Sequence, residues 1–205
     1  MLSSNGFDLW ADGYDRSVGL SDEDGSYPFA GYRAVLNRIY NLVLSAPGRE
    51  VLDVGFGTGT LTAKLYAQGC RIHGQDFSAR MLALAQAKMP GAQLYQADFT
   101  AGLATPLKAQ RYDAIIATYS LHHLSDAQKV DFLHSLLPLL KEGGRILIGD
   151  VAFPTRAALE ACRTAAGDDW DDEESYFVFD ELAAAFPTMR FEQLSPCAGL
   201  ITLTP

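Results

Sequence analysis

The residues with the clearest chemical meaning form a glycine-rich segment, Asp53-Val-Gly-Phe-Gly-Thr-Gly59. Glycines there let the backbone turn sharply and approach a ligand, and a helix that begins nearby directs N–H groups toward it. The dinucleotide-binding pattern would place its third glycine at position 60, where this chain has Thr60. The Asp53 carboxylate would also oppose a diphosphate, at a cost of about 4 kcal/mol for each like-charge pair ~4 Å apart at an effective dielectric constant of ~20. The segment therefore favours a cationic ligand that carries no phosphate.

Two further carboxylates follow apolar runs. Asp76 lies roughly 20 residues beyond the glycines, where an acid accepts hydrogen bonds from both ribose hydroxyls. Asp98 follows the next run, where it either accepts from an adenine amino group or caps a loop. Phe99 beside it either stacks on adenine or belongs to the core. These features together predict a pocket for S-adenosylmethionine, with contacts from Asp53, Gly55, Gly57, Gly59, Asp76, Asp98 and Phe99.

Candidate catalytic residues follow the apolar run at 112–118. Thr118 and Tyr119 are expected at the methionine end of the pocket, near the point where the strand order reverses. His122 and His123 are adjacent and point about 100° apart on a helical turn, so we expect only one to face the cavity. We assign His122, together with Tyr119, as the catalytic candidate, because an unperturbed pKa of ~6.5 leaves an imidazole able to accept a proton. His123 is expected to cap or pack, and no set of metal ligands stands out.

The elements that position these residues alternate in type. Short β-rich runs separated by helical patterns predict a parallel sheet with right-handed crossovers; they lie at 51–54, 71–75, 93–96, 112–118 and 145–149. Ser78 and Ser125 are expected to cap helices. The last two runs, 191–194 and 200–203, lie too close together for a crossover helix, so we expect an antiparallel hairpin.

We expect a single domain over 1–205. Its parts are a helical cap at 1–49, a cofactor-binding core at 50–150, a helical lid region at 151–187 and the hairpin at 188–205. The acidic run 168–174 is a solvated loop, the negatively charged start of a helix that begins near Asp171, or a lid that favours a cationic or neutral acceptor. Asp150 is another possible contact for an acceptor.

Composition limits the partners. The 205 residues carry 16 basic and 25 acidic side chains, a net charge of −9, which disfavours nucleic acid and anionic membrane surfaces. The three cysteines form no Cys-x-x-Cys pair. The start lacks the features of a secretory signal, and no apolar run approaches the ~18 residues of a membrane span. We therefore expect a cytoplasmic protein; the oligomeric state is not indicated.

Five segments in order resemble the motifs of class I S-adenosylmethionine-dependent methyltransferases: VLDVGFGTG (51–59), GQDFS (74–78), QADF (96–99), TYSLHHL (118–124) and GGRILIGD (143–150). The resemblance covers about residues 7–150 and is greatest to bacterial YrrT-like members. It implies an α/β, Rossmann-like, seven-stranded sheet in the order 3-2-1-4-5-7-6, with strand seven antiparallel and helices on both faces. It also implies cofactor contacts from Phe77, Thr118 and Tyr119, and places Tyr14 near the methionine moiety, where an ordinary packing role is the alternative.

The expected function is methyl transfer from S-adenosylmethionine to a small-molecule acceptor by in-line displacement. The segments outside the core can roof a pocket but offer no separate module for gripping a protein or nucleic acid. The alternatives are a non-catalytic protein that binds S-adenosylmethionine or S-adenosylhomocysteine, and an aminopropyl transferase. A nicotinamide oxidoreductase is disfavoured by Thr60 and Asp53.

Overall fold

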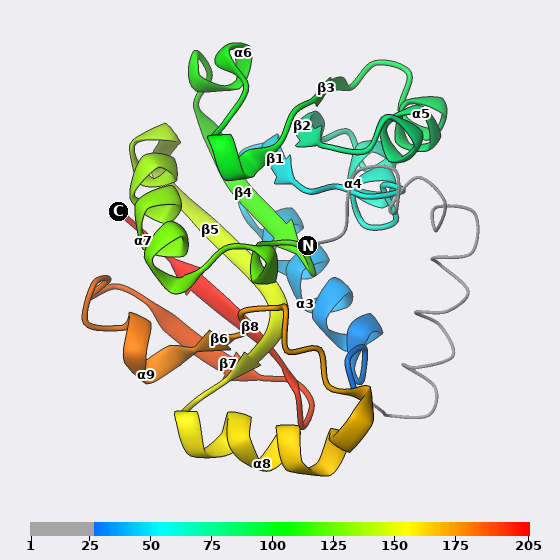
Figure 1. Ribbon diagram of the computed structural model, residues 1–205. Helices are drawn as coiled ribbons and strands as arrows, with labels where there is room; N and C mark the ends of the chain where they lie inside the picture. Colours follow the sequence, from blue (N-terminus) through cyan, green and yellow to red (C-terminus); the bar gives the residue numbers. More distant parts are fainter. Residues whose placement is uncertain (1–26) are drawn as a thin grey trace.

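A computed structural model describes residues 27–205, so Tyr14 of the predicted site lies outside the described residues. Within this range one eight-stranded sheet forms the centre of the molecule (Figure 1). Its strands are β1 (Glu50–Val54), β2 (Arg71–Asp76), β3 (Gln93–Gln96), β4 (Tyr112–Thr118), β5 (Leu140–Phe153), β6 (Phe177–Val178), β7 (Arg190–Gln193) and β8 (Ala198–Leu203). The strand order is β3-β2-β1-β4-β5-β8-β7, with β6 paired to β5 off this path.

The pairing confirms the predicted fold class. Strands β1 to β5 are mutually parallel, and β8 runs antiparallel to both β5 and β7. The last two strands thus form the expected hairpin, and they take the places of the sixth and seventh strands in the predicted order. The unpredicted addition is β6, whose two residues pair in parallel with Ala152 and Phe153. Two residues carry no periodicity, so the sequence gives no signal for such a strand.

Strand β5 is also longer than expected. It spans 14 residues and continues to Phe153, beyond the expected end of the core at residue 150. Gly143 and Gly144, which precede the run expected at 145–149, already lie inside this strand. The extension carries Asp150 inside the sheet, where its exposed fraction is 1%.

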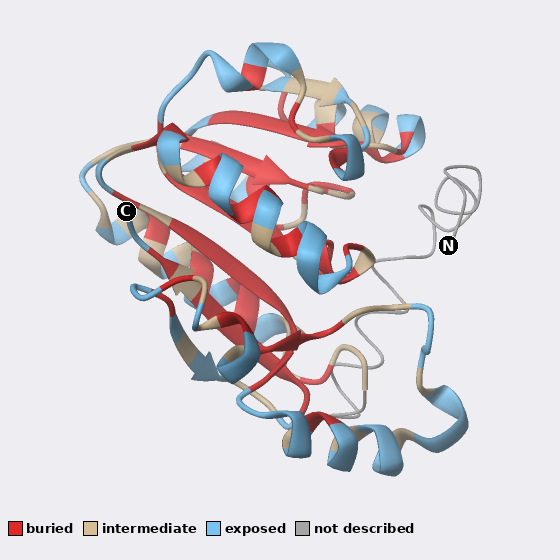
Figure 2. Cartoon of the chain, turned by 60° about the vertical axis from the view of Figure 1, so that its left-hand side comes forward, coloured by how far each residue is buried: buried red, intermediate tan, exposed pale blue. Residues whose placement is uncertain are grey.

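Helices cover both faces of the sheet (Figure 1). One core cluster joins the sheet to α3 (Tyr32–Ser45), α4 (Thr62–Ala67), α5 (Ala79–Lys88) and α8 (Arg156–Ala166). The other joins it to α6 (Thr105–Lys108), α7 (Asp126–Leu136) and α9 (Phe179–Leu182). The strands are buried between helices whose outer sides are exposed (Figure 2). This two-sided burial explains the continuous apolar runs of the central strands.

Capping residues set several helix boundaries. Ser78 Oγ accepts a hydrogen bond from the Met81 N–H at 3.0 Å at the start of α5, and Ser125 forms a capping box with Gln128 at the start of α7. Both caps were predicted. The alternative of a helix that begins near Asp171 is not found in the described chain: residues 170–176 form a turn and irregular backbone, and α9 begins at Phe179. None of the helices within residues 27–205 combines the length and apolar character that crossing a bilayer requires.

Helix α3 packs closely against β5, where a glycine makes room for it. A Cβ atom added to Gly149 would lie 2.9 Å from Ile39 Cδ1 and closer still to Val35 Cγ1, and both helix side chains are fully buried. This contact holds the start of α3, with Tyr32, near the carboxyl ends of the central strands.

We therefore expect Gly149→Ala to lower the free energy of unfolding by about 1–3 kcal/mol, because the added methyl group overpacks the interface between α3 and β5. Urea denaturation followed by circular dichroism measures the change. Ala161→Ser, which adds one atom at an exposed position of α8, serves as the control and should change stability by less than about 0.5 kcal/mol. Equal stability of Gly149→Ala and the wild type would contradict the packing argument.

Candidate functional site

An open cavity of about 680 Å³ lies at the carboxyl ends of β1, β2 and β4. This is the edge at which parallel α/β sheets bind ligands. Seven of the predicted site residues line it: Gly55, Gly57, Asp76, Phe77, Phe99, Thr118 and Tyr119. The structure therefore brings most of the predicted residues together.

The loop after β1 owes its shape to its glycines. Gly55, Gly57 and Gly59 have φ angles of 75°, 54° and 76°, in the left-handed region that favours glycine. A Cβ at Gly55 would lie 2.5 Å from Ser120 Cβ, whereas a Cβ at Gly57 would meet no atom within 4 Å. Gly55 therefore allows the loop to approach the segment after β4, and Gly57 keeps open space on the cavity side. Gly59 does not line the cavity; it lets the loop approach Ala85 of α5.

Asp76, at the end of β2, is bound to this loop. Its Oδ2 accepts a hydrogen bond from the Gly57 N–H at 2.8 Å, and its Oδ1 accepts from the Ser78 N–H at 2.9 Å. The carboxylate also lines the cavity. This is the position predicted for an acid that binds ribose hydroxyls.

Asp53 lies one layer behind the cavity wall. It is 1% exposed, and its Oδ2 accepts a hydrogen bond from the hydroxyl of Thr62, which itself lines the cavity. Its Oδ1 has no hydrogen-bond partner among the described residues. Burial raises the pKa of Asp53 to about 7; the Thr62 hydrogen bond opposes this rise, and the charge of Asp76 adds to it.

Asp98 and Phe99 occupy different environments. Asp98 is exposed, does not line the cavity, and caps the short 3-10 helix η1 (Phe99–Ala101) by accepting from the Thr100 N–H at 2.8 Å. The structure thus gives Asp98 the loop-capping role that was the alternative to an adenine contact. Phe99 is 4% exposed, packs 6.2 Å from the ring of Phe132 and also lines the cavity; it therefore belongs to the core, and its stacking on adenine stays a prediction.

Aromatic side chains form one wall of the cavity. Tyr119 packs with its ring centroid 5.1 Å from Tyr32 and 5.4 Å from Phe29. Tyr119 is the non-glycine residue with a positive φ, 48°, in the described chain, and its N–H donates to the Gly149 carbonyl at 2.8 Å. Such a conformation costs of order 1–3 kcal/mol and is concentrated at functional sites.

The two histidines are arranged differently from the expectation. They form the 3-10 turn η2 (Leu121–His123), and His123 lines the cavity, whereas His122 does not. His122 turns inward because its Nδ1 makes a 2.7 Å hydrogen bond to Asp150 Oδ1. The expectation that His122 faces the cavity and His123 packs is therefore reversed, and a proton transfer by His122 would have to pass through a neighbouring group.

The two imidazoles also differ in pKa. Burial lowers the pKa of His122, but the charge and hydrogen bond of Asp150 together with the charge of Glu174 outweigh it, so the pKa is raised above 6.5. Burial and the charge of His122 lower the pKa of His123 to about 4. His123 is thus neutral at pH 7. The pKa of Glu174 is shifted in the opposite direction, since burial raises it.

The acidic run has an inward-facing end that the sequence did not reveal. Asp172 pairs with Arg163 at 2.6 Å on the surface, but Glu174 Oε1 lies 3.4 Å from His122 Nε2. The Ser175 N–H donates to the His122 carbonyl at 2.8 Å and holds this part of the chain against η2. Glu174 is the last acid before the apolar run that enters the core at β6. This position was the only feature of the sequence that could have indicated its inward orientation.

Trp170, near the start of the run, anchors it to the body of the molecule. Its ring stacks on Tyr27 at 4.9 Å and meets Tyr176 edge-on at 4.9 Å. Residues 170–176 therefore pack against the body of the molecule through aromatic rings, between the helical parts of the region expected as a lid.

Comparisons with known proteins agree with this geometry. Residues 51–144 match the family model described as a methyltransferase domain. An uncharacterized methyltransferase of Geobacillus kaustophilus is 38% identical over 193 residues, which cover 90% of this chain and 86% of that protein. The uncharacterized methyltransferase YrrT of Halobacillus halophilus is 28% identical over 91% of this chain and 87% of that protein.

Solved structures show the same fold. The DhpI–SAH complex superposes with a TM-score of 0.71 and 20% identity, over 98% of this chain and 94% of that one. The chain belongs to the methyltransferase family, with the YrrT-like bacterial proteins among its relatives.

Proposed function

We propose that this methyltransferase uses S-adenosylmethionine and methylates a small-molecule acceptor in the cavity beyond β1 and β4. The observation that carries the proposal is the arrangement of Asp76, which lines the cavity while the Gly57 N–H holds its carboxylate against the glycine loop. An acid at this place suits ribose hydroxyls. The complex of DhpI with SAH, which has the same fold, supports this choice of cofactor.

The residues present fit such a cofactor. The buried Asp53 Oδ1 without a described partner makes this part of the wall electronegative, which favours a ligand with an ammonium and a sulfonium over one with phosphates. The left-handed backbone at Gly57 leaves open space beside Asp76. Phe77 and Phe99 line the same cavity and provide apolar surface for a purine ring.

S-adenosylmethionine, when bound, would supply a methyl group on a positively charged sulfur: in-line attack of the acceptor on the methyl carbon would break the carbon–sulfur bond, with S-adenosylhomocysteine as the leaving group. The task left to the protein is therefore positioning and exclusion of water, which can supply about 7–11 kcal/mol of barrier reduction. Asp76 and the glycine loop are the groups that would hold the cofactor. Tyr32, Tyr119 and His123 line the same cavity, and we place the acceptor beside them.

The shape of the cavity supports a small acceptor. Its aromatic wall consists of Tyr119, whose position is fixed by the Gly149 carbonyl, and Tyr32 from α3. The segment 170–176 is held against η2 by the hydrogen bond from Ser175 to His122. An acceptor that reaches His123 must therefore fit between packed elements, which suits a small molecule better than a chain segment.

Titration of the purified protein with S-adenosylmethionine and with S-adenosylhomocysteine tests the proposal first. We expect heat of binding for both, and absence of binding for both would contradict the cofactor assignment. Methyl transfer is then measured as formation of S-adenosylhomocysteine with a panel of thiols, amines, phenols and carboxylates. Cofactor binding without turnover on the panel would favour a non-catalytic binding protein, and turnover only with decarboxylated S-adenosylmethionine would favour aminopropyl transfer.

We expect Asp76→Ala to weaken the binding of S-adenosylmethionine by roughly 1–3 kcal/mol, because the buried ribose hydroxyls of the cofactor lose an ionised hydrogen-bond acceptor. Isothermal titration calorimetry measures the change, and thermal unfolding without ligand tests whether the loop remains folded. Asp131→Ala, at an exposed position of α7, should leave the affinity unchanged. If Asp76→Ala folds and binds as the wild type does, Asp76 has no part in cofactor binding.

The raised pKa of Asp53 predicts a pH-dependent effect on stability. With a pKa of about 7 in the folded chain against an ordinary 3.8, the folded state keeps a proton that the unfolded chain releases, so this group's contribution to stability is lost as the pH rises from about 4 to 7. We expect Asp53→Asn, without ligand, to gain on the order of 2 kcal/mol relative to the wild type between about pH 5 and pH 8.

Urea denaturation of both proteins at the two pH values measures this gain. Asp113→Asn is the matched control, because hydrogen bonds and the charge of Lys141 outweigh its burial and lower the pKa of Asp113. That carboxyl is ionised in both states throughout the interval, so its effect on stability should not change between the two pH values. A pH-independent effect of Asp53→Asn would show that Asp53 is ionised in the folded protein across the interval.

A further inference from the structure

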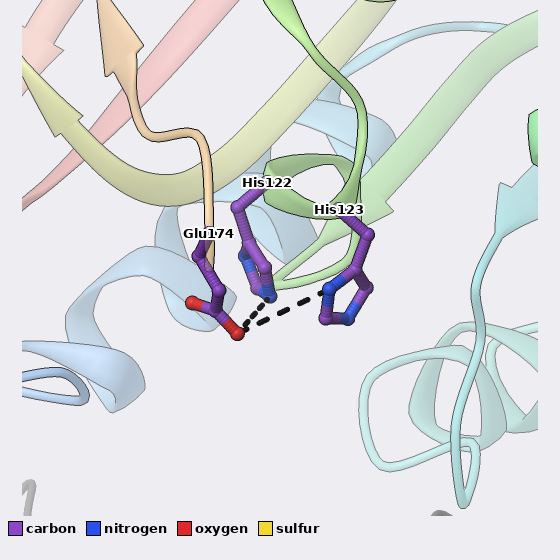
Figure 3. Close-up of side chains that lie close together, drawn as sticks. All are labelled: His122, His123 and Glu174. Carbon is purple, nitrogen blue, oxygen red and sulfur yellow. Dashed lines mark ion pairs between the residues drawn. The ribbon is translucent and has the colours of Figure 1, made fainter. Parts of the chain in front are cut away.

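Three side chains beside the cavity bring metal-ligand atoms together. His122 and His123 come from the turn after β4, and Glu174 comes from the segment before β6; their imidazoles and carboxylate face one another (Figure 3). One ligand atom from each lies within 4.8 Å of the others. No metal site was predicted from the sequence, because about 50 residues separate the glutamate from the histidines.

The distances suit a common ion. Glu174 Oε1 lies 3.4 Å from His122 Nε2 and 4.0 Å from His123 Nδ1. An ion with tetrahedral ligands at about 2.1 Å separates neighbouring ligand atoms by about 3.4 Å. The first pair already has this spacing, and a shift of about 0.6 Å in the side chain of His123, which is 25% exposed, gives it to the second. The ligand nitrogens of His122 and His123 lie within 4.8 Å of each other, so the movement of His123 must also bring this third pair to the same spacing.

A buried carboxylate orients one of the imidazoles. Asp150 Oδ1 lies 2.7 Å from His122 Nδ1 and also accepts from the Val151 N–H at 2.8 Å. When the carboxylate accepts a hydrogen bond from Nδ1, the lone pair of a neutral His122 is on Nε2, the nitrogen that faces Glu174. Metal-binding histidines almost always have such a carboxylate, carbonyl or water on their second nitrogen.

The segment that carries Glu174 is fixed in place. The Ser175 N–H donates to the His122 carbonyl at 2.8 Å, and the buried Lys129 ammonium donates to the Ser175 carbonyl at 2.5 Å and to Asp126 at 2.9 Å. Lys129 is thus engaged with Asp126 and the backbone, and the Glu174 carboxylate is held on the side of the histidines. Contacts with the rest of the protein, and not only contacts among the three ligand side chains, therefore hold the ligand atoms in position.

We propose that His122, His123 and Glu174 bind a divalent first-row transition-metal ion, with Asp150 as the positioning residue for His122. Two imidazoles and one carboxylate favour ions such as Zn²⁺, Fe²⁺ or Co²⁺ over Mg²⁺ and Ca²⁺, which take oxygen ligands. Three protein ligands leave coordination positions for water or for a donor atom of a small molecule. His123 lines the cavity, so such a donor atom could belong to the methyl acceptor; this role, unlike the binding of the ion, rests on the proposed function.

Titration of chelator-treated full-length protein with Co²⁺, followed by its visible d–d absorption and by calorimetry, tests the site. We expect one bound Co²⁺ with the bands of nitrogen and oxygen ligands, displaced by Zn²⁺. Glu174→Gln and His123→Ala should each lose at least tenfold in Co²⁺ affinity, and Asp150→Asn 10–100-fold with altered bands. His134→Ala, at an exposed position of α7, is the control for adventitious histidine binding and should retain the bands.

Absence of saturable Co²⁺ binding by the wild type would overturn the proposal and favour His122 as an imidazolium held between Asp150 and Glu174. Bands that persist unchanged in Glu174→Gln and His123→Ala would also overturn it. Thermal unfolding of each variant shows whether it is folded. The Co²⁺ titration is done without S-adenosylmethionine and the cofactor titration with chelator present, so failure of the metal site and failure of the proposed function are distinguishable.

Discussion

The hydrogen bond between the Gly57 N–H and Asp76 ties the loop after β1 to the end of β2, and the position of the cavity depends on it. The same loop approaches the segment after β4, since a side chain at Gly55 would collide with Ser120. The Ser120 hydroxyl donates to the Val54 carbonyl at 2.9 Å and closes this second contact. The ends of three parallel strands are thereby held at one edge, which a bulkier residue at position 55 would separate.

The buried carboxylate of Asp53, behind this loop, destabilises the folded state. Asp53 is buried with only one of its oxygens bonded among the described residues, and burying a polar group without a partner costs free energy. Protonation relieves the cost in the absence of ligand, which is why the pKa of Asp53 rises to about 7. A ligand with positive charge would favour the ionised form instead, so the residue that weakens the empty protein is suited to strengthen its complex with a cation.

The features that the sequence predicted depend on neighbouring residues, whereas the features that it missed depend on contacts between residues far apart in the chain. The main strands, the Ser78 and Ser125 caps and the glycine loop with Asp76 follow from apolar runs, capping chemistry and turn chemistry, all local properties. Strand β6 does not, because its two residues are defined only by pairing with Ala152 and Phe153. The orientation of His122 is likewise set by Asp150, 28 residues away, and no pattern within the turn itself encodes it.

The same contrast separates the two ends of the cavity. The end that we propose for the cofactor is built from consecutive loops after β1 and β2, whereas the other end joins Tyr32 of α3, Tyr119 and His123 to the segment that carries Glu174. Residues from such distant parts of the chain can change without disturbing the glycine loop. Under the proposed function, we therefore expect the determinants of acceptor choice in α3 and in residues 170–176, where packing and not a local motif fixes the side chains.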